Sequence, residues 1–135
     1  MTFEELNEVR NIKISIESAE KALETWRRAE SLKIPTRDGL PKSKNADSRV
    51  ERLAVKIADA SRRVDALKMQ LADAIERLEQ KICDEISDAN AQTLFIMRYV
   101  DCMYFRDIGL AMGYSEAHIY YLHKITCQKI IVAYS

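Results

Sequence analysis

The sequence predicts an all-α protein in which a long two-helix antiparallel coiled-coil hairpin precedes a three-helix helix-turn-helix unit. Two long stretches carry apolar residues at alternating spacings of three and four, which is the pattern of a coiled-coil seam. Both prolines of the chain lie between those stretches. The last third has the glycines and apolar spacing of a helix-turn-helix. We expect the hairpin over residues 1–87 and the helix-turn-helix domain over residues 88–135.

The first long helix is expected over residues 3–33. Its apolar positions alternate in steps of three and four, as an a/d seam requires, and the positions between them are mostly polar or charged, with Glu and Arg among them. The seam comprises Val9, Ile12, Ile16, Ala19, Leu23 and Trp26. Because Trp26 falls on this seam, we expect it to pack there and not to bind a ligand.

A break follows over residues 34–47, where Pro35, Gly39 and Pro41 interrupt the periodic pattern. Proline lacks a backbone N–H and cannot continue a helix interior, so this stretch is expected to be a loop. Basic residues exceed acidic ones in and around it, between Lys33 and Arg52. Two interpretations remain open: a solvated loop, or an arm that contacts phosphates.

The second long helix is expected over residues 48–86, with Asp47 or Ser48 as its N-cap. Its seam runs without a miss through Val50, Leu53, Ile57, Ala60, Val64, Leu67, Leu71, Ala74 and Leu78, and Ile82 and Ile86 continue it. At 1.5 Å per residue this helix would be roughly 55–60 Å long. A solitary helix would leave the stripe in water, so it needs residues 3–33 folded back on it or another chain. Because the second helix is longer than the first, folding back leaves part of the stripe uncovered, and a homodimer through the long helices is expected to cover it. Packing of that part on the C-terminal unit is the alternative.

A short helix is expected over residues 89–101, with Asp88 or Asn90 as its cap. All six tyrosines of the chain lie between Tyr99 and Tyr134, and none lies in the long helices. This change of composition supports a boundary near residue 87.

The stretch Tyr104–Lys129 has the pattern of a helix-turn-helix. Gly109 falls where two helices approach closely, and Gly113 falls at the turn, where glycine adopts a positive φ without a Cβ clash. Ser115 is placed to cap the next helix, and Glu116 follows where a negative charge suits the helix dipole. The shared core is expected from Ile108, Met112, Ile119 and Leu122. An ordinary αα-hairpin in a helical core is the alternative.

The outward face of the last helix is the candidate DNA-binding surface. It is expected to place hydrogen-bonding side chains against base edges and phosphates in a major groove of double-stranded DNA. The candidate residues are Ser115, Glu116, Ala117, His118, Tyr120, Tyr121 and Lys124. The tyrosines have an alternative role as core or interface residues.

Composition sets further limits. The 21 Lys and Arg balance the 21 Asp and Glu, so no global positive charge indicates nucleic-acid binding. No run of about 18 apolar residues indicates a membrane span, and the acidic N-terminus is unlike a signal peptide. The three separated cysteines indicate reduced thiols in a cytoplasm. His118 and His123 are five residues apart, unlike an i, i+4 metal pair, and no motif indicates an enzyme or a cofactor.

The segment MRYVDCMYFRDIGLAMGYSEAHIYYLHKITCQKI resembles the fourth-region helix-turn-helix of sigma factors. The matching residues are Met97-Arg98-Tyr99, Asp107-Ile108-Gly109, Met112-Gly113-Tyr114-Ser115 and Ile119. The chain departs from that pattern at Gly109, where alanine is usual, at Tyr104, where a Ser or Thr cap is usual, and at Thr126-Cys127, where an Ala-Leu pair is usual.

More closely, residues 39–130 are similar to small phage-encoded regulators of the RinA and ArpU type, through GLPKSKNADSRVERLAVKI and the Tyr-x-Leu-His run at residues 120–123. The resemblance implies a phage or prophage regulator of late genes in the bacterial cytoplasm, acting on DNA as a dimer or on RNA polymerase. The alternative is a helical scaffold or interaction protein, such as a phage packaging component of the small-terminase kind.

Overall fold

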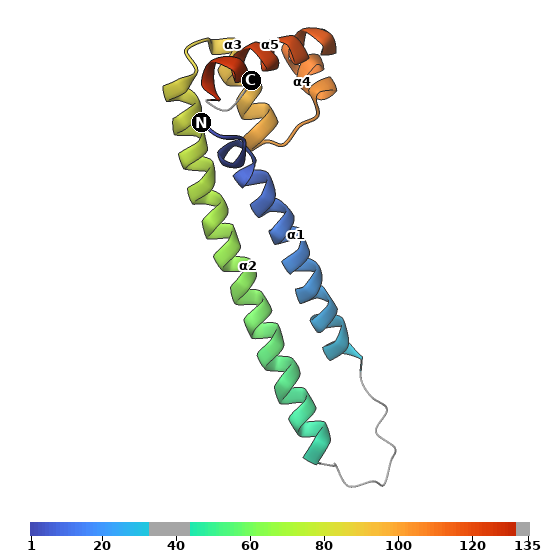
Figure 1. Ribbon diagram of the computed structural model, residues 1–135. Helices are drawn as coiled ribbons and strands as arrows, with labels where there is room; N and C mark the ends of the chain where they lie inside the picture. The colour runs from blue at the N-terminus through green and yellow to red at the C-terminus, as the bar shows by residue number, and fades with distance from the viewer. Residues whose placement is uncertain (33–43, 132–135) are drawn as a thin grey trace. The chain divides into compact units, whose positions relative to one another are not determined.

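The computed structural model describes residues 1–32 and 44–131, with residues 44–47 described as backbone only. The regular structure of these residues is entirely helical, which confirms the predicted all-α class (Figure 1). The elements are α1 (Phe3–Ser31), α2 (Lys44–Glu85), α3 (Ala89–Phe95), the π-helical turn η1 (Ile96–Val100), α4 (Phe105–Met112) and α5 (Glu116–Ile130). None of the described helices is long and apolar enough to cross a membrane.

The chain divides into two compact units. The terminal unit comprises Met1–Lys13 and Gln70–Ser135, and the helix-pair unit comprises Ile14–Met69. Both α1 and α2 contribute to both units. The boundary expected near residue 87 stays a prediction, and the terminal unit draws on residues from both sides of it.

In the helix-pair unit, α1 and α2 pack through the predicted seam. Ala19, Leu23 and Val64 are buried, and Ile57, Ala60 and Leu67 lie partly buried against them. Lys68 pairs with Glu20 at 3.4 Å, and the Lys56 ammonium lies 4.3 Å from the Trp26 ring centre. Since higher numbers on α1 meet lower numbers on α2, the helices run antiparallel where they touch. The complete hairpin stays a prediction, because residues 33–43 lie outside the described part.

The predicted start of the second helix is wrong. The helix α2 begins at Lys44, so Asp47 and Ser48 lie inside it and neither is its N-cap. No proline or glycine follows Pro41 before the periodic stretch, so nothing in this sequence stops the helix from extending back toward that proline. The rest of the expected loop and its proposed phosphate contacts fall on residues outside the described part.

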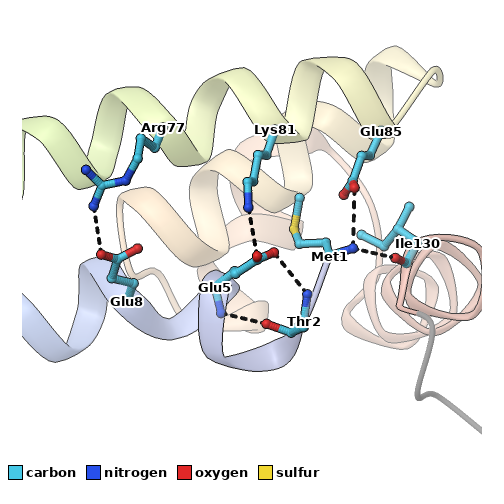
Figure 2. A network of polar contacts seen from close by, with 8 residues as sticks. All are labelled: Met1, Thr2, Glu5, Glu8, Arg77, Lys81, Glu85 and Ile130. Carbon is cyan, nitrogen blue, oxygen red and sulfur yellow. Dashed lines mark hydrogen bonds and ion pairs between the residues drawn. The ribbon is translucent and has the colours of Figure 1, made fainter.

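In the terminal unit, α1 starts with a reciprocal cap. The Thr2 hydroxyl accepts a hydrogen bond from the Glu5 N–H at 3.1 Å, and the Glu5 carboxylate accepts one from the Thr2 N–H at 3.2 Å. This capping box satisfies two backbone N–H groups that a helix start leaves without partners (Figure 2). Hydrogen bonding from Lys81 lowers the pKa of Glu5, which keeps the carboxylate ionised.

Polar contacts join the first turns of α1 to the end of α2 in the same unit. Figure 2 shows the pairs Glu5–Lys81 at 2.7 Å and Glu8–Arg77 at 2.8 Å. The Met1 ammonium donates to the Ile130 carbonyl at 3.1 Å and forms an ion pair with Glu85 at 3.3 Å. Exposed pairs of this kind add little stability individually, so the buried residues beneath them hold the helices together. These include Leu6, Val9, Leu78, Ile82, Leu94, Phe95, Ile108, Ile119 and Cys127.

Candidate nucleic-acid interface

The turn between α4 and α5 has the local geometry that the sequence predicts. Gly113 ends α4 in the left-handed region, with φ 77° and ψ 28°. The Ser115 side chain accepts a hydrogen bond from the His118 N–H at 3.2 Å and so caps α5. Three residues, Gly113–Ser115, therefore connect the two helices. Both the C-terminal glycine and the serine cap are confirmed.

Gly109 lies where the turn passes closest to α4. A Cβ atom at this position would lie 2.8 Å from the Tyr114 carbonyl oxygen and 3.6 Å from the Ile119 side chain. The Tyr114 N–H donates to the Gly109 carbonyl at 2.9 Å, which holds the turn against the helix. The predicted need for a small residue is confirmed, and its cause is the backbone of the turn.

The core of the helix-turn-helix comprises the predicted residues. Ile108 and Ile119 are fully buried, and Met112 and Leu122 are partly buried against the same core. The helix before them also has its predicted cap, since Asp88 accepts from the Ala91 N–H at 2.9 Å. The choice left open between Asp88 and Asn90 is therefore decided for Asp88.

The short helix expected over residues 89–101 is only partly correct. It is α-helical to Phe95 and then widens into the π-helical turn η1. The Asp101 N–H donates five residues back to the Ile96 carbonyl at 3.0 Å, and Cys102 has a φ of 59°. Propensity and periodicity do not predict such a turn, which is why the sequence indicated a plain α-helix.

All seven candidate residues lie on exposed positions at the start and along one side of α5. Tyr120 and Tyr121 are 52% and 61% exposed, so neither is a core residue. The Tyr120 ring packs on Phe105 of α4, with the ring centres 4.6 Å apart, which leaves its outer edge available. The arrangement brings hydroxyl, imidazole, carboxylate and ammonium groups to one surface; whether they bind DNA stays a prediction.

Two further residues position this surface. Tyr114 in the turn accepts a hydrogen bond from the Asn90 side chain at 3.3 Å, and its ring lies 4.8 Å from that of His118. The turn is therefore attached both to α3 and to the first turn of α5. These two roles could not be predicted from the sequence, because they depend on tertiary neighbours.

His123 belongs to the inward side of α5, where it joins an aromatic cluster. Its Nε2 lies 2.6 Å from the Tyr99 hydroxyl, its ring stacks on Phe95, and the edge of Phe105 faces it. Burial, with a smaller contribution from Arg98, lowers the pKa of His123 to about 4. Burial raises the pKa of Tyr99 to about 12. At neutral pH the tyrosine therefore donates and the neutral imidazole accepts.

Arg98 connects this cluster to the segment before α4. Its guanidinium lies 4.2 Å from the Phe105 ring centre and donates to the Met103 carbonyl at 2.9 Å. The buried Cys127 thiol lies 3.6 Å from His123 Nε2, and burial raises its pKa to about 11, so it stays protonated. The cluster contains stacked rings and satisfied polar groups, and among the described residues no group of His, Cys, Asp and Glu is arranged to hold a metal ion.

Charge is distributed unevenly between the two units. The sequence of the terminal unit contains twelve acidic and eight basic residues, a net −4. The sequence of the helix-pair unit contains nine acidic and thirteen basic residues, a net +4. The candidate surface on α5 therefore belongs to the acidic unit, with Lys124 as its one cationic residue among the seven.

The chain matches no family model, no curated protein and no solved structure. The resemblance to sigma-factor region four and to phage regulators therefore stays a prediction from the residues that carry it.

Proposed function

We propose that the chain is a sigma-like DNA-binding transcription regulator of phage or prophage, controlling late genes, in which the start of α5 enters the major groove. The observation that carries the proposal is the three-residue turn. The glycine in the left-handed region, the close approach at Gly109 and the serine cap together present the outer side of α5. A recognition helix requires such an exposed outer side to enter the major groove.

The chemistry of the exposed residues supports direct readout more than strong phosphate binding. Ser115, His118 and the two tyrosine hydroxyls are hydrogen-bonding groups suited to base edges and phosphate oxygens. Lys124 supplies a single positive charge. A protein that neutralises few phosphates binds DNA weakly without the correct sequence, so the proposal includes a homodimer or RNA polymerase as a source of further contacts.

The test is selection of bound sequences from a random double-stranded DNA pool, followed by fluorescence anisotropy at two salt concentrations. Lys124→Ala should weaken binding to all sequences alike and make the salt slope shallower by about 0.9. Tyr120→Ala should change sequence preference, by roughly 1–3 kcal/mol for each good hydrogen bond to a base edge that the substitution removes. Lys129→Ala, which removes the same charge from the last turn of the same helix, is the matched control. Absence of any enriched sequence and of binding at low salt would reject the proposal for the isolated protein.

A helical scaffold or interaction protein is the second candidate. The observation that favours it is the net −4 charge of the unit that contains the helix-turn-helix, because acidic surfaces repel the phosphate backbone. A packaging component of the small-terminase kind belongs to this class. It predicts stable assembly, measured by sedimentation velocity, together with an absence of DNA binding at low salt. A homodimeric regulator also assembles without DNA, so the DNA titration separates the two candidates.

A further inference from the structure

A groove runs between α1 and α2 inside the helix-pair unit. One part of it, about 340 Å³, has a floor of small apolar side chains, Ala19, Ala22 and Ala60, and is bordered by Trp26. A second part of about 290 Å³ shares Trp26 and Lys56 with the first and continues past Ala29 and Leu53. We call the two parts together the Trp26 groove.

One wall of the Trp26 groove is basic. The helix α2 lines it with Arg49, Arg52, Lys56 and Arg63, and Asp59 is the one acidic residue among them. Asp59 is already paired with Arg62 at 3.0 Å. Among the described residues, Arg49, Arg52 and Arg63 form no ion pair or hydrogen bond, and Lys56 lies over the Trp26 ring. The wall therefore presents positive charges that nothing described in the unit neutralises.

We propose that the Trp26 groove binds an acidic amphipathic helix of a partner protein. Small floor residues let a third helix approach closely, because interaxial distance depends on the side chains at the contact. From Arg49 to Arg63 the wall extends roughly 21 Å at 1.5 Å per residue, enough for about four turns of helix. Apolar residues of the incoming helix would cover the alanines and Trp26, while its carboxylates would meet the arginines.

The other occupants fit less well. A second copy of the helix-pair unit has a net charge of +4 and would offer the arginines mainly Glu30, Glu51 and Asp65, because four of its seven described acids are paired within the chain. The paired acids are Glu17, Glu20, Glu24 and Asp59. The segment 33–43 carries Lys33, Arg37 and Lys42 against Asp38, so its charge has the same sign as the wall. Nucleic acid would meet the arginines but would leave the alanine floor without an apolar partner.

Trp26 gives a direct assay, since it is the one tryptophan of the chain and borders both parts of the groove. The probe is a synthetic tryptophan-free helical peptide with leucine and alanine on one face and glutamate on the other. Titrated into the full-length protein, it should shift the Trp26 emission in a saturable manner. The same peptide with lysine in place of every glutamate should produce no shift.

Two arginines, Arg63 in the wall and Arg27 outside the groove, provide the matched pair of variants. Arg63→Glu should weaken peptide binding about tenfold by replacing attraction with repulsion at the wall. Arg27→Glu makes the same change of charge at an exposed position that lines neither part of the groove, and should alter affinity by less than about twofold. For the floor, Ala22→Gln should weaken binding, whereas Ala66→Gln on the exposed side of α2 should not. Circular dichroism of each variant checks that helix content is retained.

Several outcomes would overturn the proposal. Equal weakening by Arg27→Glu and Arg63→Glu would show general charge attraction and no defined groove. Binding of the lysine peptide would remove the charge argument. A short DNA duplex that shifts Trp26 and competes with the peptide would identify a nucleic-acid surface. A dimer whose dissociation shifts Trp26 and in which the peptide has no effect would assign the groove to a second copy. None of these outcomes requires the helix-turn-helix to bind DNA, so the proposed function is tested separately.

Discussion

Replacing Gly109 by alanine tests whether the turn is pressed against α4. In an open helix position the change from glycine to alanine stabilises by about 1 kcal/mol, because glycine loses more backbone freedom on folding. Here the added Cβ would lie 2.8 Å from the Tyr114 carbonyl oxygen, a backbone atom that cannot rotate away. Overpacking of this kind costs about 1–3 kcal/mol. The two effects oppose each other, and their sum predicts a net loss of about 0–2 kcal/mol in the free energy of unfolding.

Ala111→Gly is the control that separates the two effects. Ala111 is exposed on the same helix, two residues away, so its replacement measures the propensity term alone, a loss of about 1 kcal/mol. Urea denaturation followed by circular dichroism gives both free energies. If Gly109→Ala stabilised the protein by as much as Ala111→Gly destabilises it, the turn would not be pressed against α4.

Gly113→Ala extends the comparison. No atom lies within 4 Å of a Cβ built there, so packing opposes nothing, but φ is 77°. A side chain in the left-handed region costs about 1–2 kcal/mol. Glycine is therefore required for a different reason at each position: a close contact at position 109 and a positive φ at position 113.

Three further predictions concern the same unit and the long helices. Ile119→Ala should lower the free energy of unfolding by about 2–5 kcal/mol, whereas Tyr121→Ala on the exposed side should change it by less than about 0.5 kcal/mol, both measured by urea denaturation. The pKa of His123 is about 4 in the folded protein, whereas an unfolded histidine titrates near 6.5. The free energy of unfolding should therefore decrease as the pH falls from about 6.5 to about 4 and change little outside that range. His123→Gln, which still accepts a hydrogen bond, should make this decrease smaller. Self-association through the long helices should appear in sedimentation velocity as a concentration-dependent dimer, and a strict monomer at high concentration would contradict it.

Local rules explain why the turn and its caps were predictable from sequence. A positive φ selects glycine, and a helix start selects serine or aspartate, so Gly113 and Ser115 could be assigned from short-range chemistry, and Asp88 was one of two candidate caps. The seam of the long helices was predictable for a related reason. Burial repeats with the helical period, and Leu23 and Val64 are buried where the period places them.

What depends on tertiary neighbours was not predictable in the same way. The inward position of His123 is an exception that could have been predicted. Ile119 and Cys127 lie four residues to either side of it, on the same face of the helix. The hydrogen-bond partner of His123, Tyr99, lies in the π-helical turn, and no residue pattern indicates that turn. The start of α2 was misplaced because capping residues also occur inside helices that begin earlier.

Because the two units have opposite net charges, the salt dependence of DNA affinity is the single measurement that best shows which residues contact DNA. Each phosphate neutralised contributes about −0.9 to the slope of log affinity against log salt. If the helix-turn-helix alone contacts DNA, two exposed cations, Arg106 at the start of α4 and Lys124 on the candidate surface of α5, allow about two phosphates and a slope of roughly −2. A slope of roughly −4 or steeper requires basic residues beyond these two, and Arg49→Glu and Arg63→Glu would then make it shallower. If the slope is shallow and neither variant changes it, the basic wall does not contact DNA and is free to bind the acidic helix. The acidic unit then contains the face that reads DNA, and the basic unit contains the groove that binds a protein.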